Sequence, residues 1–336
     1  MALSTQNPYS RTRNYFSMLD INEAQRENHI AFLNLGFRPL FFSASLSSVL
    51  LMLGWFLIYQ FGDQAITQIP AQYWHAHEMI FAYTMAVVVG FLLTAVKNWT
   101  GVQTIHGRLL LMLLMVWLIA RFLPFVDGFP LILQAIIDTA FLLFSAVAVA
   151  YPVVKVRMWK NFGVVSKVML MAIAHIVYYL GLLGILEHGV QWGLYGAFYL
   201  ILALIFVMAR RVVPFFIERG VDSEQPLKNS ILIDAASMIL FLAYAVFEVF
   251  WQTNMVYMVS FLLFVLHSIR LYFWHHSGIW KTTLLWSLYL AYLFLAIGFG
   301  LKTGSYFVTI SPYLVIHCFA LGIGMFSIAM MSRVTL

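Results

Sequence analysis

The side chains best suited to chemistry in this sequence gather at the start of one apolar segment. His75, His77 and Glu78 stand within four residues in the run Y-W-H-A-H-E-M-I-F, and a long apolar stretch follows them. That stretch of about twenty residues is long enough to span a bilayer. Polar groups in such a position are costly unless something binds them. The pattern therefore indicates a binding site at the beginning of a membrane helix.

The composition indicates an all-α protein, a polytopic transmembrane helical bundle. Of its 336 residues, 63% are hydrophobic and 10% are charged, and the mean hydropathy is +0.89. A soluble domain carries roughly a quarter charged residues. The net charge of +6 does not indicate a nucleic-acid partner, because loop charges in membrane proteins mainly set orientation. The single Cys318 excludes an internal disulfide, and without a C-x-x-C-H run any haem would be held non-covalently, as b-type haem.

Hydrophobic runs predict about ten transmembrane helices after a polar tail. Residues 1–36 are predicted to form a cytoplasmic tail, and residues 37–336 a single transmembrane domain. The spans are expected near residues 38–60, 74–96, 105–123, 129–152, 163–186, 192–213, 231–250, 255–274, 282–301 and 311–331.

The basic residues predict the orientation of these spans. With the N-terminus in the cytoplasm, all but two of the 19 Lys and Arg residues fall on the inner side. The exceptions are Arg121 and Lys302. Because positive charge is retained inside, both termini are predicted to be cytoplasmic.

Orientation gives each histidine a depth. His75 and His77 lie at the outer end of the second span, and His317 lies near the same level in the tenth. His175 is placed in the middle of the fifth span, where a neighbouring hydroxyl or carbonyl would satisfy it. Residues two apart on a helix point about 200° away from each other. Either His75 and His77 therefore serve two sites, or His75 precedes the regular helix and turns inward.

Neutral imidazoles near the outer surface suit haem iron or copper, which makes His75, His77 and His317 the predicted metal ligands. Glu78 could accept a hydrogen bond from a ligating histidine or carry a proton. Arg121 could hold a haem propionate, or equally extend to lipid headgroups.

Acidic residues within the spans are few, and each is a candidate functional residue. Asp234 and Glu248 lie near span ends and could reach water, whereas Asp138 lies deeper. The sequence alone names no partner for Asp138.

Several motifs resemble the NnrS family, in the right order over the whole chain beyond the tail. They are F-R-P-L-F-F at 37–42, W-H-A-H-E-M-I-F at 74–81, G-F-L-L-T-A-V-K-N-W-T-G at 90–101, R-V-V-P-F-F at 211–216 and M-S-R-V-T-L at 331–336. The resemblance implies a bacterial inner-membrane protein of nitric oxide metabolism and nitrosative-stress tolerance that carries haem and copper. It assigns ligand roles to His75, His77 and His317.

Two departures from the family pattern affect this expectation. Members usually continue after the R-V-T-L run with a G-H-T-G-R turn and two more helices, whereas this chain ends at Leu336, as a truncated or divergent short form would. In the ninth span, Tyr289 of L-Y-L-A-Y stands where the family pattern has a histidine.

Three hypotheses follow. The first is a membrane protein that binds haem and copper and handles nitric oxide or iron-nitrosyl species, as a binding protein or as an oxidoreductase with an unidentified electron donor. In it, His77 and His317 are haem ligands with Arg121 beside them, His75 belongs to a second metal, and Glu78 carries protons. The second is a small-solute or ion transporter that uses the outer histidines. The third is a non-catalytic assembly or protection factor.

Overall fold

The computed structural model describes residues 31–62, 68–221, 227–251 and 253–335. Most of the predicted tail, residues 1–36, lies outside the described residues. Within the described part, ten helices are long and apolar enough to cross a membrane, which confirms the number predicted from the hydrophobic runs. The chain is a multi-pass membrane protein.

Most spans are single α-helices, whereas the second and seventh each contain a π-helical segment. In chain order the spans are α2 (Phe37–Phe61); α3 (Ala71–His77), η3 (Glu78–Thr84) and α4 (Met85–Thr100) in one continuous helix; α5 (Gly107–Phe122); α6 (Leu131–Lys155); α7 (Phe162–Leu182); α8 (Gly189–Gly220); α9 (Ile231–Val246) with η6 (Phe247–Trp251); α10 (Met255–Trp274); α11 (Thr283–Gly304); and α12 (Pro312–Thr335).

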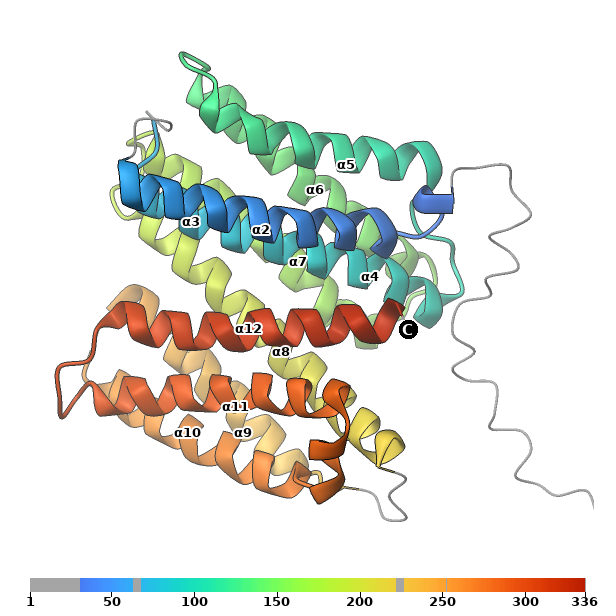
Figure 1. Cartoon of the computed structure of the whole chain (residues 1–336), viewed down its shortest axis with the longest axis vertical. Helices are drawn as coiled ribbons and strands as arrows, with labels where there is room; N and C mark the ends of the chain where they lie inside the picture. Colours follow the sequence, from blue (N-terminus) through green and yellow to red (C-terminus); the bar gives the residue numbers. More distant parts are fainter. Residues whose placement is uncertain (1–30, 63–67, 222–226, 252, 336) are drawn as a thin grey trace, which may run out of the picture.

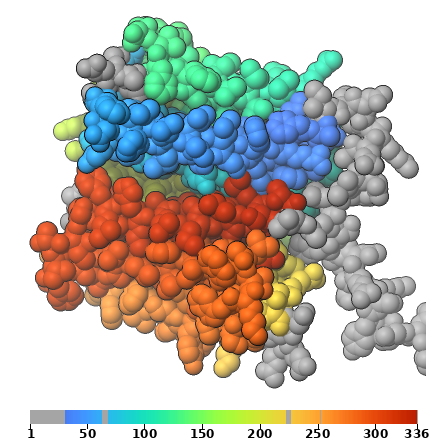
Figure 2. Space-filling model, in the orientation of Figure 1, coloured from blue at the N-terminus to red at the C-terminus, as the bar shows by residue number. Residues whose placement is uncertain are grey.

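The spans lie side by side with roughly parallel axes, in two groups (Figure 1). The helices from α2 to α7 form one group, α9 to α12 form the other, and α8 runs obliquely between them. Of the ten spans, the second is the most buried. Figure 2 shows α2 alongside α12 on one face of the bundle. Phe42, Val49 and Phe56 of α2 are exposed, as expected for a helix in contact with lipid. We call the end with the α5–α6 and α11–α12 connections the outer end, after the predicted orientation.

Close packing of α7 on α8 positions the middle of α7. A Cβ atom added to Gly193 would lie 2.6 Å from the carbonyl oxygen of Ala174, so only glycine allows this approach. Small residues at helix contacts are the usual means of bringing membrane helices together. Ala174 precedes His175, and the contact therefore fixes the helix turn that carries this histidine.

Candidate metal centre

The second span changes its hydrogen-bonding pattern directly after His77. There α3 ends and the π-helical segment η3 begins at Glu78. Side chains stabilise the wider turn: the Thr84 hydroxyl donates to the Met79 carbonyl at 2.7 Å, and Trp117 Nε1 donates to the Ala82 carbonyl at 3.2 Å. Short π-helical segments are rare and often lie at functional sites.

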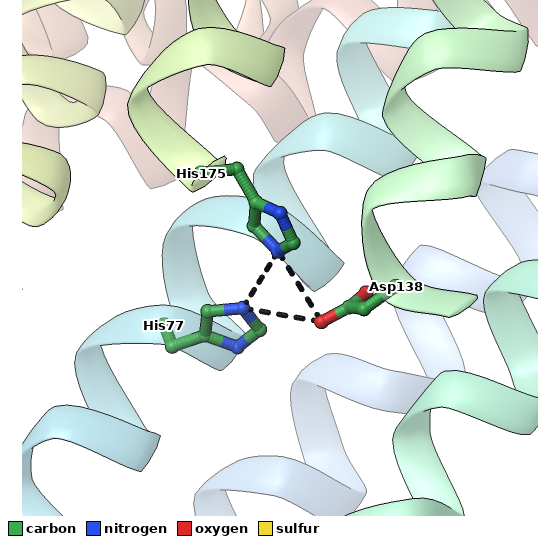
Figure 3. A group of neighbouring side chains, drawn as sticks. All are labelled: His77, Asp138 and His175. Carbon is green, nitrogen blue, oxygen red and sulfur yellow. Dashed lines mark hydrogen bonds and ion pairs between the residues drawn. The ribbon is translucent and has the colours of Figure 1, made fainter. Parts of the chain in front are cut away.

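Three buried side chains from three different spans meet beside this segment (Figure 3). His77 Nε2 lies 3.1 Å from His175 Nε2 and 3.2 Å from Asp138 Oδ2. His175 Nε2 lies 3.3 Å from the same carboxylate oxygen. The residues come from α3, α6 and α7, and each is at most 3% exposed. We call His77, Asp138 and His175 the triad.

The other ring nitrogen of each histidine has its own partner. His77 Nδ1 lies 3.0 Å from Glu78 Oε1, and His175 Nδ1 lies 2.9 Å from the Thr139 hydroxyl. Glu78 also accepts from Arg121, and in the tautomer where His77 Nδ1 donates to Glu78, the Nε2 lone pair faces the triad. The Thr139 hydroxyl can accept from His175 Nδ1 in the same way, which would leave the His175 Nε2 lone pair toward the triad. Such partners are typical of metal-ligating histidines, whose rings they orient.

Arg121 from α5 contacts both carboxylates of the cluster. Its Nη1 donates to both oxygens of Glu78 at 2.6 Å, and its Nη2 pairs with Asp138 Oδ1. Two carboxylates and one guanidinium give a net charge of −1 when both imidazoles are neutral. All of these groups are buried, so an unbalanced charge would be costly. A bound cation, or a proton on an imidazole, must balance it.

The donor set fits a single transition-metal ion. Metal–ligand bonds of about 2.0 to 2.2 Å place neighbouring donors roughly 2.8 to 3.6 Å apart in octahedral or tetrahedral geometry. The three separations within the triad, 3.1, 3.2 and 3.3 Å, lie in this range. Two imidazoles and one carboxylate that leave positions open are a common set for non-haem iron(II), and imidazole also suits copper.

Haem does not fit the triad. The porphyrin takes four positions on haem iron, so protein ligands can occupy only the two opposite faces. His77 Nε2 and His175 Nε2, 3.1 Å apart, leave no room for a macrocycle between them. Aromatic rings also pack on the triad: Tyr178 stacks on His77 with ring centroids 4.9 Å apart, and Phe81 meets His175 edge-on at 4.7 Å.

A family model described as NnrS protein matches residues 31–336, which include every residue of this cluster. The chain belongs to the NnrS family. Searches of curated proteins and of solved structures found no match. Membership agrees with the resemblance read from the sequence motifs, and the triad adds a group of side chains that could hold a metal ion.

The structure places the other two ligand candidates of this NnrS-family chain apart from the triad. His75 points away from His77, as expected for residues two apart on a helix, and its ring stacks on Trp55 of α2 with centroids 4.5 Å apart. Its Nδ1 is buried and has no hydrogen-bond partner among the described residues. His317 is exposed on α12, donates from Nδ1 to the Tyr313 carbonyl at 2.7 Å, and lies close enough to His75 for electrostatic interaction. His75 and His77 therefore face two different places.

Both basic residues at the outer end have internal partners. All three guanidinium nitrogens of Arg121 have partners, since its Nε donates to the Trp117 carbonyl at 3.3 Å and its other two nitrogens contact Glu78 and Asp138. Binding of a haem propionate by Arg121 stays a prediction. Lys302 pairs with Glu248 at 2.7 Å. The third acid considered from sequence, Asp234, pairs with Arg270 at 2.8 Å.

Proposed function

We propose that this NnrS-family protein binds a redox-active metal ion, iron or copper, through His77, Asp138 and His175, and handles nitric oxide there in the bacterial inner membrane. One observation carries the proposal: His77 Nε2, Asp138 Oδ2 and His175 Nε2 lie within 3.3 Å of one another in a buried cluster whose charge is −1 when both imidazoles are neutral. A bound metal ion would balance this buried charge and use all three atoms as ligands. Family membership supports the link to nitric oxide.

The position of the triad suits a small apolar substrate. Nitric oxide dissolves in lipid, so it needs no aqueous channel to reach a centre inside the bundle. Rings of Phe81 and Tyr178 pack on the triad and keep water away. A three-ligand ion keeps an open position where nitric oxide or the nitrosyl group of an iron-nitrosyl species would bind. Glu78, hydrogen-bonded to both His77 and Arg121, would orient His77 and could carry a proton to the site.

The b-type haem expected for the family is assigned to the second pair of histidines. Two observations support this assignment: the buried Nδ1 of His75 lacks a partner among the described residues, and His317 keeps its Nε2 free while its Nδ1 is bonded. Haem and metal ion would then occupy different places in the outer half of the bundle.

Metal analysis of the detergent-purified protein tests the triad. With iron or copper supplied, we expect about one ion per chain, lost in both His175→Asn and Asp138→Asn. The matched control is His267→Asn, a buried histidine of α10 that stacks on Phe206 with centroids 4.5 Å apart, away from the triad. Retention of the ion in both triad variants, or a wild-type protein that binds none, would contradict the proposal.

Spectroscopy separates the metal ion from the haem. We expect a visible haem absorption that is lost in His75→Ala and His317→Ala but kept in His175→Asn. Conversely, nitric oxide should change the electron paramagnetic resonance of the non-haem ion in the two outer-histidine variants and leave no such signal in His175→Asn. A folded, metal-free and colourless wild-type protein would instead favour a transporter or an assembly factor.

A further inference from the structure

A second polar site lies at the outer end of the other helix group. It is a cavity of about 370 Å³ between α8, η6, α10, α11 and the start of α12. Its lining includes the Glu248–Lys302 ion pair and four tyrosines, Tyr195, Tyr199, Tyr257 and Tyr306. The triad residues are not part of it. We call it the tyrosine cavity.

The charge of the tyrosine cavity favours a neutral ligand. Among the described residues that line it, Glu248 and Lys302 are the charged ones, and they neutralise each other at 2.7 Å. An ionic ligand would have to compete with this pair in a place where charge is poorly solvated. A neutral ligand with oxygen atoms can instead accept from the ammonium group and donate to the carboxylate while the pair stays intact.

The tyrosines favour a flat ring that carries polar groups. Tyr195 and Tyr199 are neighbours on α8 with centroids 6.4 Å apart, and Tyr257 and Tyr306 pack at 5.4 Å across the cavity lining. Among the described residues, the hydroxyls of Tyr195 and Tyr257 make no hydrogen bond to another side chain or carbonyl. Rings of this kind offer both apolar faces and free polar tips to a bound ligand.

The rim of the tyrosine cavity indicates that the ligand has an apolar tail. Phe307 and Val308, which line the cavity from the α11–α12 connection, are 77% and 62% exposed. In a membrane-spanning bundle, such side chains face lipid near the outer surface. A molecule that enters the cavity by its head can therefore leave its tail in the bilayer.

We propose that the tyrosine cavity binds the headgroup of a lipid-soluble quinone or quinol. This ligand class is neutral, has a flat ring with oxygen atoms at opposite ends, and carries an isoprenoid tail. Lys302 would donate to one ring oxygen, Glu248 would accept from the hydroxyl of the reduced form, and a tyrosine would pack on the ring. The binding site does not depend on the metal ion of the triad.

Equilibrium binding to the purified protein in phosphatidylcholine nanodiscs tests this proposal, with a decyl-tailed benzoquinol, kept reduced under anaerobic conditions, as the probe. We expect saturable binding of about one molecule per chain that decanol does not displace. Glu248→Gln should weaken binding by about 10- to 100-fold, since a hydrogen bond to a charged group contributes roughly 1.5 to 3 kcal/mol. Thr309→Trp, on the exposed cavity rim, should abolish it by filling the cavity.

The control is Glu187→Gln, the same change on an exposed residue between α7 and α8 that does not line the cavity. Its binding should equal that of the wild type, and circular dichroism would verify folding of each variant. Absence of saturable binding, equal affinity in the wild type and Thr309→Trp, or displacement by decanol or by phosphatidylethanolamine would overturn the proposal. Metal content is measured on the same samples, so a failed quinone site is distinguishable from a failed metal site.

Discussion

The outer end of the bundle contains two ion pairs that each use a glutamate from a π-helical segment but have different surroundings. In the first helix group, Glu78 opens the π-helical segment η3 and pairs with Arg121. In the second, Glu248 lies in the π-helical segment η6 and pairs with Lys302. The two basic residues are the two exceptions to the positive-inside distribution predicted from the sequence. Each is paired with a glutamate of the same bundle, which neutralises its charge.

The two pairs differ in what surrounds them. Asp138 joins the Arg121–Glu78 pair, so that site is closed, carries an additional negative charge and contains two histidines. The Lys302–Glu248 pair has no additional charge and borders an open cavity. A closed site with surplus negative charge selects a cation, whereas an open neutral site selects an uncharged molecule. The additional carboxylate and the two histidines therefore distinguish the closed site from the open one.

The largest effect is expected from removing the guanidinium of the closed site. Arg121→Met leaves Glu78 and Asp138 buried with a charge of −2 when the imidazoles are neutral. Breaking a buried ion pair from one side costs about 3 to 5 kcal/mol. We expect a large loss of thermal stability in detergent, measured by a tryptophan-fluorescence melting curve.

The double variant Arg121→Met/Glu78→Gln is the control for this change. It restores the charge of −1, so it should recover part of the lost stability although it removes one more native side chain. The contradicting outcome is additivity. If Glu78→Gln lowers the stability of Arg121→Met by as much as it lowers that of the wild type, the buried charge is not the cause of the loss.

A smaller effect, on metal affinity, is expected from removing the Thr139 hydroxyl, which contacts His175 of the triad. Thr139→Val keeps the shape of the side chain but removes the partner of His175 Nδ1. Loss of such a partner typically lowers metal affinity about 10- to 100-fold. Competition with a chelator of known affinity would measure it. Ser145→Ala, a buried hydroxyl on the same helix without a hydrogen-bond partner among the described residues, should leave the affinity unchanged.

Hydrophobicity was sufficient to predict the ten spans, because each is long enough to cross a bilayer and is followed by a polar or turn-forming connection. It did not place every helix end correctly. The fifth span was expected to end at residue 186, since Ile185 and Leu186 continue the apolar run, but α7 ends at Leu182. This shift of four residues assigned His175 to the middle of the membrane.

With the observed helix ends, the triad residues lie at one level. His175 is seven residues from the outer end of α7 at Leu182 (182 − 175), and Asp138 is seven residues from the outer end of α6 at Leu131 (138 − 131). His77 is six residues from Ala71, where α3 begins (77 − 71). Depth was therefore an informative signal, and the error in one helix end concealed it.

The two π-helical segments could not be predicted in the same way. A π-helix differs from an α-helix in its hydrogen-bond register, and an almost uniformly apolar segment such as residues 79–96 carries no periodicity that distinguishes the two. The direction of His77 relative to α6 and α7 depends on helix packing as well. The sequence thus identified His77 as a ligand candidate, while its partners Asp138 and His175 required the structure.

The smallest effect on stability is expected from Lys302→Met, which removes the basic partner of the open site as Arg121→Met does in the closed site. Lys302→Met leaves Glu248 without its partner, but the Glu248 side chain is 20% exposed beside a cavity and can be hydrated. Partly exposed ion pairs contribute about 1 kcal/mol or less, so the melting curve should move far less than that of Arg121→Met. Quinone binding should nevertheless weaken, because Lys302 is the proposed donor to a ring oxygen. If the two variants lost equal stability, the open and closed sites would not differ in solvation as the structure indicates, and the contrast between a cation site and a neutral-ligand site would fail.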